Sequence, residues 1–236
     1  MAADDFPWRA GGGPVALVMA KPRLVVATRN RHKTEEIRAL IGTRYEVTDV
    51  NDAPGLPAIE ETGTSFLENA RLKAVGISRC VDGIVLADDS GLEVDALAGA
   101  PGVGSSSFGG REGDHARNNA RLLRELAGVP AAARRGRFRC VMVLARGGEP
   151  LAHFEGSVEG HLTDAPRGEG GFGYDPLFVP EGYQETFSEL GLEVKNRLSH
   201  RARALAQAVA WLERQEGGQF GVGAGTEPAR NSVDLP

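Results

Sequence analysis

Several features that define other protein classes are missing from this sequence. No apolar run approaches the roughly 20 residues that a membrane-spanning helix needs, so we expect no membrane association. The GxxxxGK[ST] pattern of Walker-type NTPases is absent, as are a GxSxG motif and a Cys/His arrangement suited to a covalent nucleophile. The two cysteines, Cys80 and Cys140, show neither CxxC nor metal-ligand spacing, which predicts buried free thiols in a reducing cytoplasm.

An excess of positive charge is missing as well. The formal net charge is −5, so the chain lacks the long-range attraction with which proteins bind a nucleic-acid backbone. We therefore expect no nucleic-acid partner. An anionic small molecule would have to meet a local cluster of cations.

The remaining composition is typical of a globular protein, with 41% hydrophobic and 25% charged residues over 236 positions. Residues 1–21 contain a glycine run and only a short apolar patch, and residues 216–236 are rich in glycine without hydrophobic periodicity. We predict that both ends are disordered extensions. A single folded domain would then occupy residues 22–215.

Hydrophobic periodicity predicts strands interleaved with helices. Apolar runs predict strands at residues 24–27, 84–87, 138–144, 151–158 and 177–179. Helical spacing and capping residues predict helices that begin near residues 34, 65, 114 and 199. Because the glycine pair 147–148 suggests a long hairpin beside strands joined through helices, we predict an α/β fold with a mixed sheet.

The segment TRNRHK, residues 28–33, lies between a predicted strand and the start of a predicted helix. A helix N-terminus presents unpaired backbone N–H groups and the positive end of the dipole, and both attract phosphate. The two arginines and the lysine of this segment add the local positive charge that the whole chain lacks. A solvated basic loop is the alternative interpretation. Glu35 and Glu36 follow in the expected first helical turn, where the dipole favours anions.

The segment ADDSGL, residues 87–92, directly follows an apolar strand. In open α/β sheets, ligand sites lie at the carboxyl ends of strands. Because neighbouring side chains on an extended backbone point to opposite faces, only one of Asp88 and Asp89 should face a given site. The alternative is a solvated turn, since Asp, Ser and Gly are common turn residues.

Glu60 and Glu61 precede the helix that begins near residue 65, and that helix carries Asn69 and Lys73 on its polar face. Mg²⁺ typically takes one or two protein carboxylates together with substrate phosphates and water. One of these glutamates and one aspartate would therefore suffice as protein ligands. A Glu-Glu pair on its own is more often solvated surface.

Two further segments suit the binding of a nucleobase. GGFGYDPLF, residues 170–178, combines glycines that let the main chain approach a ligand with aromatic rings that can stack on a base. KNRLSHRARAL, residues 195–205, places a histidine and two arginines at the start of the last helix, where their charge opposes the dipole. Because positive charge is unfavourable at a helix N-terminus, its presence there favours a ligand-binding role for these residues. The alternatives are a tight turn with packed aromatic rings and a solvated helix start.

Taken together and in this order, six segments resemble the non-canonical purine nucleoside triphosphate pyrophosphatases, also called inosine triphosphate pyrophosphatases. The segments are LVVATRNRHKTEEI, EETGTSFLENARLKA, LADDSGLEVDAL, APGVGS, GFGYDPLF and KNRLSHRARAL, and the match extends from about Leu24 to Leu212. The resemblance implies an elongated mixed-sheet α/β fold with a central nucleotide-binding cleft. It also implies a homodimer that requires Mg²⁺ and hydrolyses ITP, dITP and XTP to the monophosphate and pyrophosphate.

The resemblance also implies roles for individual residues. Asp89 would be the catalytic carboxylate near the metal, and Glu60 would help to bind Mg²⁺, with Glu61 as the alternative. The triphosphate would be held by Thr28, Asn30 and Lys33, within a substrate-binding segment that also contains Arg29, Arg31 and His32. The nucleotide pocket would be completed by Ser90, Phe172, Gly173, Tyr174, Asp175, Lys195, His200 and Arg201.

One segment departs from the family pattern. After APGV the bacterial family commonly has a bulky residue followed by Ser-Ala-Arg and an aromatic residue, whereas this chain has Gly104 to Phe108, with Ser107 in place of the arginine. That difference leaves one cationic contact open. Three other functions stay open beside the resemblance: a Maf-like pyrophosphatase acting on modified pyrimidine nucleotides, a nucleotide-binding module without catalysis, and a structural protein.

Overall fold

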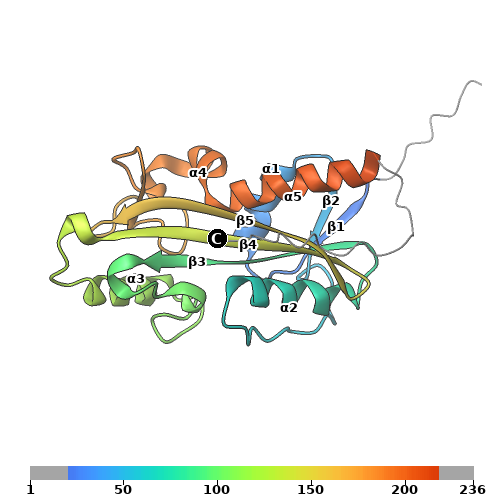
Figure 1. Cartoon of the computed structure of the whole chain (residues 1–236), viewed down its shortest axis with the longest axis horizontal. Helices are drawn as coiled ribbons and strands as arrows, with labels where there is room; N and C mark the ends of the chain where they lie inside the picture. Colours follow the sequence, from blue (N-terminus) through green and yellow to red (C-terminus); the bar gives the residue numbers. More distant parts are fainter. Residues whose placement is uncertain (1–20, 218–236) are drawn as a thin grey trace, which may run out of the picture.

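Six strands form one mixed sheet in residues 21–217, the part of the chain that the computed structural model describes (Figure 1). The strands are β1 (Arg23–Val26), β2 (Glu46–Asp49), β3 (Ile84–Val94), β4 (Arg135–Arg146), β5 (Glu149–Leu162) and β6 (Phe178–Pro180). Their order across the sheet is β2-β1-β3-β4-β5-β6. The pairs β1–β2 and β1–β3 are parallel, and the pairs from β3 to β6 are antiparallel, so the predicted mixed sheet is confirmed.

Helices cover both faces of this sheet. They are α1 (Arg31–Ile41), α2 (Phe66–Ser78), α3 (His115–Glu125), α4 (Phe187–Leu198) and α5 (His200–Gly217). Three 3-10 helices complete the described elements: η1 (Asp95–Leu97), η2 (Gly102–Gly104) and η3 (Ala131–Ala133). In Figure 1, α2 and α3 lie on one side of the long strands, and α1, α4 and α5 lie on the other. The molecule is elongated along β3, β4 and β5, as expected.

Helix α1 begins earlier than its apolar spacing indicates. Asn30 is the N-cap, and its side-chain oxygen accepts a hydrogen bond from the backbone N–H of His32 at 3.0 Å. Gly42 ends the helix with a φ of 66°, a conformation that favours glycine. Because the helix starts at Arg31, Glu35 and Glu36 lie beyond its first turn, and the prediction that they complement the dipole there is wrong.

Strand β3 is longer than the apolar run at residues 84–87 indicates. It pairs with β4 from Val85 to Val94, so Asp88 and Asp89 lie within the strand and not at its carboxyl end or in a turn. Backbone hydrogen bonds to β4 override the turn preference of Asp, Ser and Gly in this segment. The expectation that the two aspartates face opposite sides is confirmed, because Asp88 contacts α1 and α5 whereas Asp89 contacts α2.

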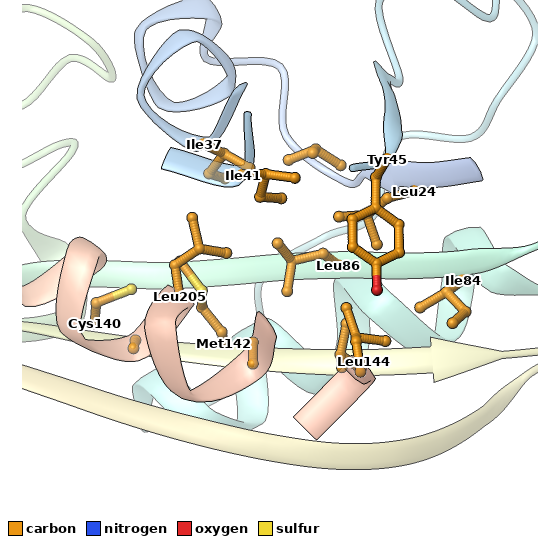
Figure 2. Packing of buried hydrophobic residues seen from close by; sticks show 14 residues of the cluster. Leu24, Ile37, Ile41, Tyr45, Ile84, Leu86, Cys140, Met142, Leu144 and Leu205 are labelled. Carbon is orange, nitrogen blue, oxygen red and sulfur yellow. The ribbon is translucent and has the colours of Figure 1, made fainter. Parts of the chain in front are cut away.

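Successive side chains of the central strands point to opposite faces of the sheet, and on each face they pack in an apolar layer. Leu24, Leu86 and Met142 pack towards α1 and α5 in the cluster shown in Figure 2. Val85 and its neighbours on β1 and β4 pack under α2, around Ala70. A third cluster fills the far half of the molecule beneath α3 and α4. Since β3 is covered on both faces, any charged side chain in its middle must find a partner inside the protein.

Several other predictions meet different outcomes. Cys140 is buried as predicted, but Cys80 is exposed just after α2, so the prediction of two buried thiols is wrong for Cys80. Hydrophobic periodicity did not predict β2 or α4. Helix α4 is interrupted at Gly191, which has a φ of 78°. The predicted extensions, residues 1–21 and 216–236, fall almost wholly outside the described residues. No helix within residues 21–217 combines the length and hydrophobicity that crossing a membrane requires.

Candidate functional site

A cleft of about 730 Å³ opens between the two helical layers around β3, a volume typical of small-molecule sites. Its wall includes Asp89, Lys33 and Lys195 together, so side chains far apart in the sequence share one cavity. It also includes other predicted site residues, namely Thr28, Arg29, Asn30, Glu60, Glu61, Ser90, Phe172, Gly173, Tyr174, Asp175, His200 and Arg201. Arg31 and His32 are exposed on the first turn of α1 and do not belong to this wall.

The junction between β1 and α1 forms one end of the cleft. The backbone N–H of Asn30 donates to the hydroxyl oxygen of Thr28 at 3.2 Å, which fixes the turn that leads into the helix. Lys33 reaches from the first turn of α1 to Asp88, with 3.0 Å between its Nζ and the Oδ2 of that aspartate. This end therefore combines a helix N-terminus with a lysine held in place, an arrangement that suits a phosphate group.

Acidic and amide side chains meet in the middle of the cleft. Asn69 Nδ2 donates to Asp89 Oδ2 at 3.1 Å. Lys73 Nζ lies 3.6 Å from Asp89 Oδ1 and 2.8 Å from Glu61 Oε2. Asn69 and Lys73 are four residues apart on α2, so both point from one face of that helix to β3. Helix α2 thus presents one amide and one cation to the carboxylate of Asp89.

Burial governs the charge state of this group. It raises the pKa of Asp89 above the ordinary value of 3.8, and the nearby Lys73 and Lys33 offset only part of that rise. For Lys73, burial by itself lowers the pKa, but the carboxylates of Asp89, Asp88 and Glu61 outweigh burial and raise it. Lys73 is therefore charged at neutral pH, beside a carboxylate that is a stronger base than an exposed aspartate.

The same region has the donor atoms that a hard cation prefers. Asp89, Glu60 and Glu61 line one cleft and offer carboxylate oxygens. No group of three or more His, Cys, Asp or Glu side chains in the described residues forms a complete ligand set. Mg²⁺ needs only one or two protein carboxylates when substrate phosphates and water supply the other oxygens, so these residues fit it.

On the opposite face of β3, Asp88 anchors a second group of charges. Its Oδ2 lies 3.0 Å from Lys33 Nζ and 3.4 Å from Arg201 Nε, and its side chain is inaccessible to solvent. Burial alone would raise the pKa of Asp88, but the cations of Lys33, Arg201 and Lys73 hold it well below its usual range. Asp88 is thus ionised and links the β1–α1 junction of the cleft to α5.

The ion pairs continue from Arg201 through Glu36 to Lys195. Glu36 pairs with Arg201, and its Oε1 lies 2.9 Å from Lys195 Nζ. Lys195 Nζ also lies 2.6 Å from Asp175 Oδ2. Burial acts to raise the pKa of Glu36, but the charges of Arg201 and Lys195 outweigh burial and lower it. These buried groups hold Lys195 and Arg201 rigidly in the cleft wall.

Aromatic side chains lie beside these cations and beside His200. Lys195 Nζ lies over the ring of Phe172, 4.2 Å from its centroid. The hydroxyl of Tyr174 donates to the carbonyl oxygen of Ser105 at 2.9 Å, which ties the glycine-rich loop to the segment containing Ser107. His200 stacks on Phe138, with ring centroids 4.9 Å apart and planes 11° apart. The cleft thus brings together cations, carboxylates and aromatic rings.

The buried imidazole of His200 is neutral at pH 7. Burial lowers its pKa well below the ordinary value of 6.5, and the charges of Arg201 and Lys195 lower it further. A neutral imidazole has one N–H donor and one acceptor nitrogen. Its Nδ1 is buried without a hydrogen-bond partner among the described residues, which leaves a polar atom to be satisfied by a ligand or water.

The chain resembles known proteins in its sequence and fold. The model of the Ham1 family matches residues 24–211. The chain belongs to the Ham1 family. Among its relatives, the dITP/XTP pyrophosphatase of Geobacillus kaustophilus is 47% identical over 197 residues, which are 83% of this chain and 97% of that protein. The dITP/XTP pyrophosphatase of Halalkalibacterium halodurans is 46% identical over 190 residues, 80% of this chain and 98% of that protein.

Solved structures of Ham1 proteins share the fold. The Staphylococcus aureus Ham1 protein superimposes with a TM-score of 0.73 at 35% identity, covering 82% of this chain and 99% of that one. The HAM1 protein of Coxiella burnetii gives a TM-score of 0.74 at 36% identity with the same coverage. The resemblance drawn from the six segments is therefore confirmed for the family and for the elongated mixed-sheet fold. The roles of individual residues stay predictions.

Sequence patterns alone assigned no role to four polar residues that lie in this cleft or beneath it in this Ham1-family protein. They are Glu36, Asn69, Lys73 and Asp88. The spacing of Asn69 and Lys73 on one helix face was visible in the sequence, as was an acidic side chain at position 36 beside the apolar Ile37. A charged residue on an apolar helix face signals a buried ion pair, and this signal would have found Glu36.

Proposed function

We propose that this protein hydrolyses non-standard purine nucleoside triphosphates, namely ITP, dITP and XTP, to the nucleoside monophosphate and pyrophosphate. One observation carries the proposal. A single cleft brings Asp89 together with the cationic junction at Lys33 and with the aromatic, cation-bearing group at Phe172 and Lys195. The names of the relatives, dITP/XTP pyrophosphatases that match over nearly their whole length, support the same substrate class.

In the proposed reaction, water attacks the α-phosphorus, the bond to the bridging oxygen of the β-phosphate breaks, and pyrophosphate leaves. Asp89 orients the water and accepts its proton. Asn69 holds one of its oxygens by donating a hydrogen bond at 3.1 Å. Because Asn69 fixes the orientation of the Asp89 side chain, the remaining lone pairs of the carboxylate point in a fixed direction.

Charge on the phosphate oxygens increases during the reaction and must be stabilised. Lys33 and Lys73 lie on the two sides of Asp89's strand and are held by Asp88 and Glu61, so they need little reorganisation. With Asp89, Glu60 or Glu61 would hold Mg²⁺, which neutralises phosphate charge when bound. The fixed cations of the chain supply the rest of the stabilisation.

The part of the cleft around Lys195, His200 and Arg201 suits a 6-keto purine. Lys195 and Arg201 are donors only, and neutral His200 offers one donor and one acceptor. Hypoxanthine and xanthine present a keto oxygen that accepts a hydrogen bond at position 6. Adenine presents an amino group there, which would leave buried donors unpaired. We therefore propose selection of ITP and XTP over ATP in this part of the cleft, with Phe172 stacking on the base.

We further propose that the protein acts as a homodimer, as the family resemblance implies, and in the cytoplasm, as the absence of a disulfide or metal-ligand spacing of its cysteines suggests. Light scattering behind size exclusion measures the mass directly. A mass of one chain at micromolar concentration would exclude the dimer.

A triphosphate panel tests the proposed activity. Purified protein with Mg²⁺ is given ITP, dITP, XTP, ATP, GTP and modified pyrimidine triphosphates, and pyrophosphate and orthophosphate are detected separately. We expect pyrophosphate from ITP, dITP and XTP, with kcat/KM at least about 100-fold above that for ATP. Preference for modified pyrimidines would indicate a Maf-like activity, and binding of ITP without pyrophosphate release would indicate a module without catalysis.

A further inference from the structure

The ring of Phe172 is held by its neighbours more than by its own backbone. Phe172 stands between Gly171 and Gly173, whose φ angles of 76° and 65° show how freely this loop turns. Its backbone N–H donates to Asp175 Oδ2 at 2.9 Å, which anchors the main chain of the loop. That bond leaves the side-chain torsions of Phe172 unconstrained. The plane of the ring must therefore be set by the groups that pack against it.

One of these groups is His32, from the first turn of α1. The two rings are stacked, with centroids 5.4 Å apart and planes 15° apart. Phe172 belongs to the wall of the cleft, as do Lys195 and Arg201, which lie near the same ring. His32 does not belong to that wall. It therefore packs on Phe172 from outside the cleft.

His32 is itself well placed for this contact. Its backbone N–H donates to the N-cap oxygen of Asn30 at 3.0 Å, and its Nδ1 lies 3.9 Å from Glu35 Oε2. Its side chain is 62% exposed, so a substitution of the ring leaves the hydrophobic core intact. The stacking joins α1 to the glycine-rich loop.

We propose that His32 is a positioning residue, which holds the Phe172 ring in the plane in which a purine base stacks. This inference deepens the proposed function and rests on it. In this role His32 does not contact the nucleotide. A stacked aromatic pair is strong enough to change the population of a ring orientation by about 2- to 10-fold. Loss of the His32 ring should therefore weaken binding of the base and leave the phosphate end unchanged.

The test compares His32→Ala, His32→Phe and wild type, with His153→Ala as the control, since His153 is exposed on β5 and outside the cleft wall. Steady-state rates with ITP give kcat and KM, and inorganic triphosphate serves as a competitive inhibitor without a base. For His32→Ala we expect KM for ITP to rise about 3- to 10-fold, with kcat within twofold and the inhibition constant of triphosphate unchanged. His32→Phe should restore KM, and His153→Ala should match wild type.

Other outcomes overturn the inference. An unchanged KM in His32→Ala would show that the Phe172 ring needs no support. An equal rise in KM and in the triphosphate inhibition constant would place His32 in the phosphate site, and failure of phenylalanine to restore KM would point to the imidazole itself. If wild type releases no pyrophosphate from any nucleotide, the proposed function fails. The variants are then compared by their calorimetric affinities for ITP and for inorganic triphosphate, which test the role of His32 without turnover.

Discussion

Glu36 offers the sharpest test of the buried charges beneath the cleft. Its side chain is 5% exposed and pairs with Arg201 and, at 2.9 Å, with Lys195. Glu36→Gln keeps the shape and removes the charge, so two buried cations lose one partner each. Asp175 still lies 2.6 Å from Lys195, and Asp88 still lies 3.4 Å from Arg201.

Breaking a buried ion pair typically costs about 3–5 kcal/mol when a charge is left without a partner. Because both cations keep a second carboxylate, we expect the lower end of that range, about 3 kcal/mol at pH 7. For a chain of this size, such a loss corresponds to a melting temperature lower by roughly 6–12 °C. Urea unfolding at pH 7 measures the free energy directly.

The difference should also depend on pH. The pKa of Glu36 in the folded protein lies below its ordinary value of 4.5. Its ion pairs therefore stabilise the fold fully above about pH 4.5 and progressively less as the pH falls through the folded pKa. The free-energy difference between wild type and Glu36→Gln should shrink in that acidic range, because the protonated glutamate resembles glutamine.

The matched control is Glu35→Gln, which changes the same residue type one position earlier, where the side chain is 70% exposed. We expect this control to lie within about 0.5 kcal/mol of wild type. A similar value for Glu36→Gln would refute the reasoning, as would a free-energy difference that stays constant down to acidic pH.

Three further outcomes are expected. Asp89→Asn should lower kcat for ITP by about 100-fold or more while the melting temperature stays near that of wild type, and turnover close to wild type would remove Asp89 from the mechanism. Lys73→Met leaves Glu61 and Asp89 without their shared cation, so kcat/KM should fall by about 100-fold, and a change below threefold would contradict the stabilising role of Lys73. Excess EDTA should abolish pyrophosphate release and added Mg²⁺ should restore it, whereas activity that survives chelation would exclude the proposed metal.

Much of the fold could be predicted from local patterns. The hairpin of β4 and β5, the capped helices α2 and α3 and the end of α1 at Gly42 all follow from residues close together in the chain. The length of β3 could not be predicted in this way. Its aspartates and its serine favour a turn locally, and only pairing with β4, some 50 residues later in the chain, keeps them extended.

For the candidate site, the sequence by itself determined, through the order of its segments, the family to which the chain belongs. Tertiary structure decided which side chains meet. Two adjacent aspartates on β3 differ because one meets Lys33 and Arg201 and the other meets Asn69 and Lys73. Burial and pairing set those charge states, and both depend on elements that only packing brings together. The same reason explains why the ion pairs of Glu36 could not be predicted, and why His32 lies outside the cleft wall although the adjacent Lys33 belongs to it.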